Sequence, residues 1–119
     1  MNKIYLGEDG IINGIYAGDQ TEETIKNGTE EFTKLIDEVR SEGKKAFLLV
    51  DLTSVGHQDS NARKAGVEGF LSMRYDKIAM FGGSPFLRNV ANLIVKAIGR
   101  TDKVKFFKTQ EEAVKWLNL

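Results

Sequence analysis

Cysteine is absent from this chain of 119 residues, and histidine and proline each occur once. The lack of cysteine excludes disulfides, thiolate metal sites, thiol nucleophiles and cysteine redox switches, and it fits a reducing compartment. A long apolar run is also missing, and the N-terminal segment is soon interrupted by Glu8 and Asp9. We therefore expect a cytoplasmic protein with no signal peptide and no transmembrane segment.

Net charge is zero, but the two signs are unevenly distributed. Residues 1–42 carry a net charge of −6 and residues 43–119 a net charge of +6. We interpret most of these charges as solvated helix faces, with a basic patch for an anionic partner or lipid headgroup as the alternative. Aromatic residues do not alternate with the basic ones, so we expect no nucleic-acid partner. The patch would consist of Arg88, Lys96, Arg100, Lys103, Lys105 and Lys108.

Length and composition are those of an ordinary globular domain. Hydrophobic residues make up 41% of the chain and charged residues 29%, and there is no repeat, low-complexity tract or linker. A chain of this size and composition can build one hydrophobic core. We expect a single domain that spans residues 1–119.

Hydrophobic periodicity and turn residues predict five strands and four helices in the order ββαβαβαβα. Asp9-Gly10 favours a hairpin turn, Asp19 with Glu22 resembles a capping box, and Gly28 is expected to weaken the first helix. The predicted strands are Lys3–Leu6, Ile11–Ala17, Lys45–Asp51, Lys77–Phe81 and Val104–Phe107. The first predicted helix ends at Gly43, and the second runs from Asp59 to about Met73. The third runs from Pro85 to Gly99, and the fourth begins at Thr109.

The segment Phe47-Leu48-Leu49-Val50 is apolar on both faces of a strand, which is typical of a central strand covered by helices. The order of elements joins an N-terminal antiparallel hairpin to parallel strands. The predicted fold is therefore an α/β domain with a mixed five-stranded sheet and four helices.

The loop that leaves this central strand is the candidate interaction site, because ligands of open α/β sheets meet the carboxyl ends of the strands. Asp59 or Ser60 could cap the following helix, and Ser84 with Pro85 should begin the third helix. No catalytic, cofactor-binding or metal-binding set is evident; His57 as a base, or Asp51, His57 and Asp59 as metal ligands, are the weaker alternatives. The candidate interaction loop comprises Val55, His57, Asp59, Ser60 and Asn61, together with Ser84 and Pro85.

The third helix has a wider apolar arc than one sheet needs to cover. Its inner stripe runs from Leu87 to Ile98, and three further apolar residues widen it. This arc could border a cavity for a small apolar molecule or lipid, or it could be buried in a homodimer. The candidate ligand or dimer surface consists of Phe86, Leu93 and Val95.

The segments Leu48–Leu52, Asp59-Ser60-Asn61, Ser84-Pro85 and Val104–Ala113 resemble the STAS domain, named for sulfate transporters and anti-sigma factor antagonists. More specifically, the chain looks like the sporulation-antagonist-like branch of bacterial proteins, whose fold is related to CRAL-TRIO lipid-binding domains. This resemblance covers most of the chain from about residue 11 onward. It implies a non-enzymatic regulatory domain that binds a protein partner.

Regulatory STAS domains carry Asp-Ser-Ser or Asp-Ser-Thr before a Gly-Leu-Gly segment, and a kinase phosphorylates the second hydroxyl residue. In this chain Asp59 and Ser60 match the first two positions, whereas Asn61 occupies the position of the phosphoacceptor. Arg63-Lys64-Ala65-Gly66 also departs from the family pattern. The resemblance therefore implies a partner-binding domain without the usual phosphoswitch, and Ser60 is only a substitute acceptor.

Two functions remain from the sequence. The first is a protein-interaction module that uses the candidate loop. The second is a domain that binds a small apolar molecule or lipid beside the third helix. A well-packed interior would favour the first, and a continuous cavity of roughly several hundred cubic ångströms would favour the second.

Overall fold

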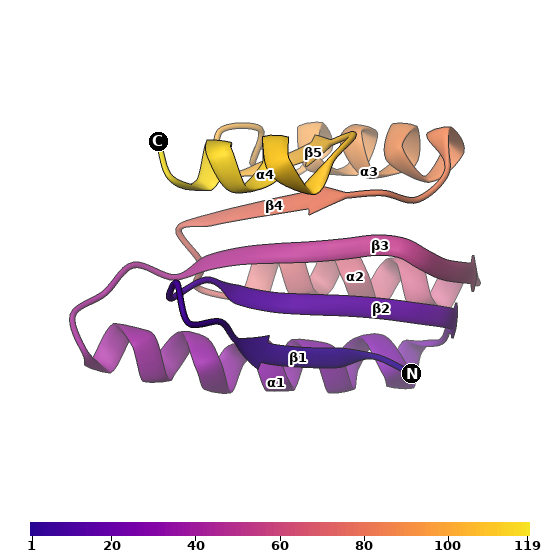
Figure 1. The fold of residues 1–119 in the computed structure, drawn as a ribbon. Helices are drawn as coiled ribbons and strands as arrows, with labels where there is room; N and C mark the ends of the chain where they lie inside the picture. The colour runs from indigo at the N-terminus through magenta and orange to yellow at the C-terminus, as the bar shows by residue number, and fades with distance from the viewer.

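Five strands form one mixed sheet in the order β1-β2-β3-β4-β5, as the computed structural model of residues 1–119 shows (Figure 1). β1 is antiparallel to β2, and the remaining neighbours are parallel, which confirms the predicted fold class. The strands are β1 (Lys3–Leu6), β2 (Ile12–Gln20), β3 (Phe47–Gln58), β4 (Lys77–Phe81) and β5 (Val104–Phe107). The helices are α1 (Glu22–Ser41), α2 (Ser60–Ser72), α3 (Pro85–Ala97) and α4 (Gln110–Leu117).

The middle strand, β3, is buried on both of its faces. Leu48 and Val50 belong to one hydrophobic cluster and Leu49 to another, because successive side chains of a strand point to opposite faces. In register, Leu48 pairs with Ile12 of β2 and with Ile78 of β4. The two-sided apolar pattern in the sequence thus correctly predicted the central strand.

The helices divide unequally between the two faces of the sheet. The larger cluster joins β2, β3 and β4 to α1 and α3, whereas the smaller one packs Ala113 and Leu117 of α4 against Leu49 and Ala79. Figure 1 shows α4 in front of the sheet, with α1 and α2 behind it. One face therefore carries three helices, and the opposite face carries α4 alone.

The start of α1 differs from the prediction. Thr21, not Asp19, is the N-cap residue: its side chain accepts from the backbone N–H of Thr24, and the Thr24 hydroxyl accepts in return. Asp19 lies within β2, where its carboxylate accepts the backbone N–H of His57 at 2.9 Å. Thr21 caps the helix because β2 continues beside β3 as far as Gln20, so that α1 can begin only after that residue.

Two glycines allow α1 to lie close to β2. A Cβ atom at Gly14 would come within 2.4 Å of the Phe32 ring, and one at Gly28 would come within 2.6 Å of the Tyr16 hydroxyl. Gly28 was predicted to be a weak point of the helix. The structure shows that the buried Tyr16 ring requires the small residue there, so its packing compensates for the lower helix propensity.

β3 is much longer than predicted, and this corrects the nature of the candidate loop. The strand continues past Asp51 to Gln58, so Val55 and His57 lie in a strand and not in a loop. Its last residues pair with β2, where Val55 is opposite Gly18 and Gln58 is opposite Gln20. None of the helices has the length and apolar character needed to cross a membrane.

Candidate functional site

The candidate site lies at the carboxyl edge of the parallel strands, where β2 and β3 extend beyond β4. β4 ends at Phe81, opposite Asp51, and the chain then turns through Gly82 and Gly83 into α3. The turn passes so close to β3 that a Cβ atom at Gly82 would lie 2.5 Å from the Thr53 hydroxyl. The end of β3 and the start of α3 therefore face each other across a gap that β4 does not fill.

An apolar cavity of about 140 Å³ lies behind this edge, between the sheet, α1, α2 and α3. Leu48, Met80 and Ile78 contribute from the sheet, and Phe32 contributes from α1. The cavity exists because the close helix neighbour of α2 is α1, whereas α3 has its main backbone contact with β5. The α2 wall includes Gly66, where an added Cβ atom would meet nothing within 4 Å.

A more polar groove of about 170 Å³ adjoins the cavity at the surface. His57 from β3, Ser84 from the start of α3 and the exposed ring of Phe86 line it. The groove and the cavity are continuous, since five residues border both spaces. These shared residues are Val55, Gln58, Arg63, Leu87 and Val90.

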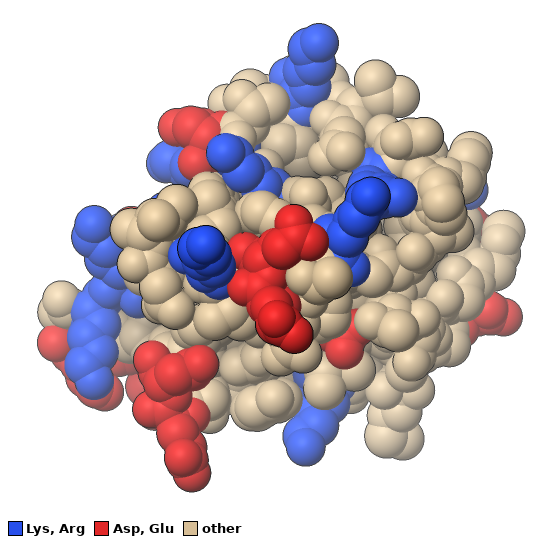
Figure 2. Space-filling model, turned by 45° about the horizontal axis from the view of Figure 1, so that its top comes forward, with Lys and Arg blue, Asp and Glu red and all other residues tan.

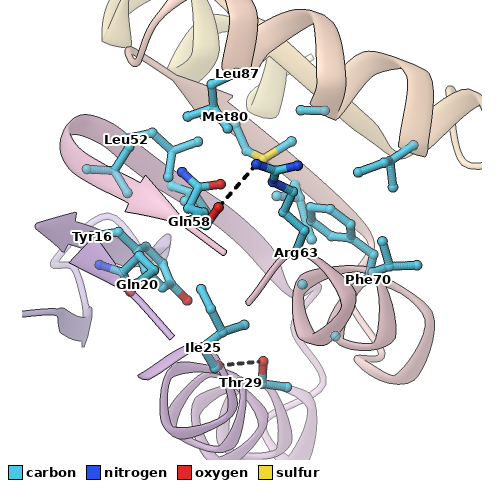
Figure 3. A pocket seen from close by; sticks show the side chains of 18 of the residues that line it. Tyr16, Gln20, Ile25, Thr29, Leu52, Gln58, Arg63, Phe70, Met80 and Leu87 are labelled. Atoms are coloured by element: carbon cyan, nitrogen blue, oxygen red, sulfur yellow. Dashed lines mark hydrogen bonds between the residues drawn. The ribbon is translucent and has the colours of Figure 1, made fainter. Parts of the chain in front are cut away.

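Arg63 is the charged residue at this junction. Figure 3 shows its side chain reaching from α2 to Gln58, whose backbone oxygen accepts a hydrogen bond from Arg63 Nη2 at 3.2 Å. The ion pairs of the chain join Lys26 to Glu22, Arg40 to Asp76 and Lys44 to Glu42, and none includes Arg63. Arg63 therefore presents an unpaired positive charge where the apolar cavity opens into the groove.

The structure brings together part of the predicted interaction loop. Val55, His57 and Ser84 line one groove, although they come from separate elements. Asp59 instead caps α2, with its carboxylate accepting the backbone N–H of Ala62 at 2.7 Å. Three other predicted residues do not line the groove: Ser60 and Asn61 lie exposed in the first turn of α2, and Pro85 is the first residue of α3.

α3 faces the cavity through a different set of residues from the one predicted. Val95 is 4% exposed and belongs to the main core, so it can serve neither as a ligand surface nor as a dimer surface. Leu93 is 68% exposed and does not border the cavity, and Phe86 borders only the groove. The face predicted to cover the sheet borders the cavity instead, through Leu87, Val90, Ala91 and Ile94.

The acidic side chains near the site hold the backbone. The Asp51 carboxylate accepts a hydrogen bond from the backbone N–H of Thr53 at 2.8 Å. The Asp59 and Asp19 carboxylates likewise accept from the backbone N–H groups of Ala62 and His57. No group of three histidine, cysteine, aspartate or glutamate residues is close enough to hold a metal ion. The site thus offers hydrogen-bond donors and one unpaired cation beside an apolar space.

Tyr16 borders the cavity from β2 and has the most perturbed acid–base equilibrium of the chain. Burial raises the pKa of its hydroxyl to about 12, and the negative charge of Glu31 acts in the same direction. The hydroxyl therefore stays protonated throughout the neutral range. Gln20 is also nearly fully buried at this wall, and its amide is held by Asn2 and by the carbonyl groups of Ala17 and Gly18.

The predicted basic patch is only partly available to a partner. Arg100 donates to the carbonyl oxygen of Phe70 and to the Tyr75 hydroxyl, both at 3.0 Å, so it ties the end of α2 to the rest of the fold. The Lys105 ammonium lies 5.4 Å from the centre of the Trp116 ring. On the face shown in Figure 2, acidic side chains lie among the basic ones and do not leave one continuous basic surface.

Sequence reasoning did not identify Arg63 or Gly66 as site residues. Arg63 was noted only as a departure from a phosphorylation motif, and a lone arginine on a helix is usually a solvated residue. The small residues of α2 were the available signal. Ala62, Ala65 and Gly69 are buried, and Gly66 and Gly69 both line the cavity.

These features define a class of protein: an α/β domain with a groove at the carboxyl edge of its sheet and an apolar cavity between its helices. The sequence model of the SpoIIAA-like family matches residues 11–118. The chain therefore belongs to the SpoIIAA-like family, in agreement with the STAS-type resemblance. A comparison with curated proteins finds no match.

A solved structure has the same fold. It is an uncharacterized protein from the DUF3478 family with a SpoIIAA-like fold, from Shewanella loihica. The two chains superpose with a TM-score of 0.69 and share 16% sequence identity, and the alignment covers 98% of this chain and 92% of the other. At this level of identity the similarity supports the fold and says nothing of shared ligands.

Proposed function

We propose that this chain is a non-enzymatic regulatory module that binds a protein partner through the groove between β3 and α3. The observation that carries the proposal is the Phe86 ring, which is 68% exposed beside His57 and Ser84 in that groove. An exposed aromatic ring with polar groups around it is the usual anchor of a protein interface. The SpoIIAA-like family supports the same class of function.

The proposed module has no phosphoswitch at Asn61. The side chain of Asn61 is an amide and lacks the hydroxyl that accepts a phosphoryl group. Ser60 and Asn61 lie at the exposed start of α2, next to the groove-lining Gln58 and Arg63.

Substitution of Phe86 tests the protein-binding proposal. A partner captured from the native host would be purified and titrated by calorimetry with the wild type, Phe86→Asp and Leu93→Asp. Leu93 is the matched control, since it lies on the same helix, is equally exposed at 68% and does not line the groove. We expect Phe86→Asp to weaken binding at least about tenfold, as loss of an aromatic anchor does, and Leu93→Asp to leave it unchanged. Loss of binding in Leu93→Asp alone would instead assign the interface to the outer face of α3.

The cavity supports a second function, the binding of a small apolar molecule. Its volume of about 140 Å³ is below that of most ligand sites, but it shows that the interior is not closely packed at this place. Gly66→Phe would place a ring in this space, whereas Gly66→Ala would leave most of it open. We expect hexan-1-ol to shift amide resonances of cavity residues in the wild type and in Gly66→Ala, but not in Gly66→Phe.

A further inference from the structure

We propose that the cavity and the groove together bind a small amphipathic monocarboxylate, with its anionic group on Arg63 and its apolar tail in the cavity. This inference rests on the second proposed function and specifies the class of ligand. It follows from the position of one unpaired cation where the apolar space meets the polar one.

The charges around the junction favour an anionic head group. Neither the cavity nor the groove is lined by an aspartate or glutamate, and Arg63 is the one residue of fixed positive charge that borders them. Asp59, four residues before Arg63, uses its carboxylate to cap α2 and makes no ion pair with the guanidinium group. A guanidinium fork matches the two oxygens of a carboxylate, and one such group balances a single negative charge.

The size of the cavity restricts the tail. An apolar cavity of about 150 Å³ in another protein accommodates benzene, so the space of about 140 Å³ suits roughly six carbon atoms. Most of the side chains that surround it are apolar. Away from the junction, the Thr29 hydroxyl donates to the backbone oxygen of Ile25, and the Gln20 amide donates to the carbonyl groups of Ala17 and Gly18, so both are already satisfied. The tail therefore needs no polar group. The acyl chains of membrane lipids are too large for a cavity of this volume, so the expected ligand is a smaller molecule than a membrane lipid.

The geometry places head and tail in the two adjoining spaces. Arg63 and Leu87 border both of them, from α2 and α3 respectively. Figure 3 shows the Arg63 side chain between α2 and Gln58, with Ile25 on the α1 wall and Phe70 on the α2 wall of the cavity. A carboxylate on the guanidinium group would thus remain in contact with water while its tail was buried beside Gly66.

Three probes with six carbon atoms each test the inference. Hexanoate, hexan-1-ol and hexylammonium would be titrated into the protein, with amide resonances followed by NMR. We expect hexanoate to bind about tenfold more tightly than hexan-1-ol, because it adds a charge-assisted hydrogen bond to Arg63, and hexylammonium to bind most weakly. The shifted resonances should come from the walls of the cavity, such as Val67 and Ala91.

Charge variants on the same helix identify the cation. Arg63→Gln should reduce the affinity for hexanoate to that for hexan-1-ol, and Arg63→Lys should retain part of the difference. Lys64→Gln is the matched control, because Lys64 is the exposed neighbour of Arg63 and does not line either space. Equal effects of Arg63→Gln and Lys64→Gln would reveal a general charge effect and overturn the assignment.

The outcomes separate this inference from the function on which it rests. If neither hexanoate nor hexan-1-ol shifts the cavity resonances, the cavity is not a ligand site and both proposals fail. If the two probes bind with equal affinity in the cavity, only the carboxylate assignment fails. Cosedimentation with phosphatidylglycerol vesicles tests whether Arg63 binds the headgroup of a membrane lipid instead. Binding to vesicles that depends on Arg63, without binding of hexanoate, would show that the ligand is a membrane lipid and not a small acid.

Discussion

α1 and α3 cover the same face of the sheet, yet they pack against it very differently. α1 buries Phe32, Ile36 and Val39 to 3% exposure or less, whereas α3 buries only Val95 to a comparable degree. Both helices have a marked apolar stripe in the sequence. Amphipathic character alone therefore does not determine how well a helix is packed.

The difference arises from the neighbours of each helix. α1 lies against β2, where Gly14 admits the Phe32 ring, and it also packs closely against α2. α3 has its main backbone contact with the edge strand β5, so one flank of its stripe faces the cavity. The packed side supplies stability, and the open side leaves room for a ligand.

Removal of a large side chain from each region should give the largest difference. We expect Ile36→Ala to lower the free energy of unfolding by about 2–5 kcal/mol, because Ile36 is fully buried on α1 and does not border the cavity, so its removal leaves a void in a closely packed layer. Ile94→Ala should lower it by less than half of that amount, since Ile94 is half-buried and already borders an open space. Urea denaturation of both variants measures this, with the exposed Thr33→Ala as a control. Equal losses would show that the two regions are packed alike.

The pH dependence of stability probes the contact between β2 and α1 through Tyr16. Its pKa is raised to about 12 in the folded protein, from an ordinary value of 10.0 in an unfolded chain. The unfolded state therefore loses this proton first, and the contribution of Tyr16 is complete below pH 10 and disappears as the pH rises through 12. A difference of about 2 between the pKa values of the folded and unfolded states corresponds to at most about 3 kcal/mol in the free energy of unfolding.

Comparison of the wild type with Tyr16→Phe isolates this effect from the ionisation of lysines and of Tyr75. Urea denaturation between pH 9 and pH 12 should show the wild type losing stability more steeply than the variant above pH 10. Parallel curves for the two proteins would mean that the Tyr16 hydroxyl is not held in an apolar environment. This test measures the β2–α1 contact without creating a large cavity.

Local signals explain which parts of the fold could be predicted. Ser84 and Thr109 were identified as helix starts because their hydroxyl groups can accept backbone N–H bonds, and each is an N-cap residue. Gly43 and Gly99 have φ angles of 75° and 71° at the ends of α1 and α3, where their lack of a Cβ atom allows this conformation. These features depend on a few neighbouring residues and are therefore visible in the sequence.

The features that sequence analysis missed depend on distant contacts. The second half of β3 contains Thr53, Gly56 and His57 and has no apolar pattern; its pairing with the end of β2 makes it a strand. The cavity likewise depends on the separation of α2 from α3, which no local pattern encodes. The sequence pointed to the carboxyl edge of β3 as the candidate site, but the position of Arg63 between the cavity and the groove is visible only in the three-dimensional arrangement.

The smallest effect that distinguishes the two regions comes from a matched pair of helix glycines. Gly28→Ala and Gly66→Ala gain the same helix propensity, about 0.5–1 kcal/mol. At Gly66 an added Cβ atom meets nothing within 4 Å, so we expect the full stabilisation. At Gly28 the new methyl group would come within 2.6 Å of the hydroxyl of a buried tyrosine, and displacement of that ring should exceed the gain in propensity. Urea midpoints should therefore move in opposite directions, upward for Gly66→Ala and downward for Gly28→Ala. Equal stabilisation by the two substitutions would show that the Tyr16 ring moves without cost in free energy, and the β2–α1 contact would then be no tighter than the α2 wall of the cavity at Gly66.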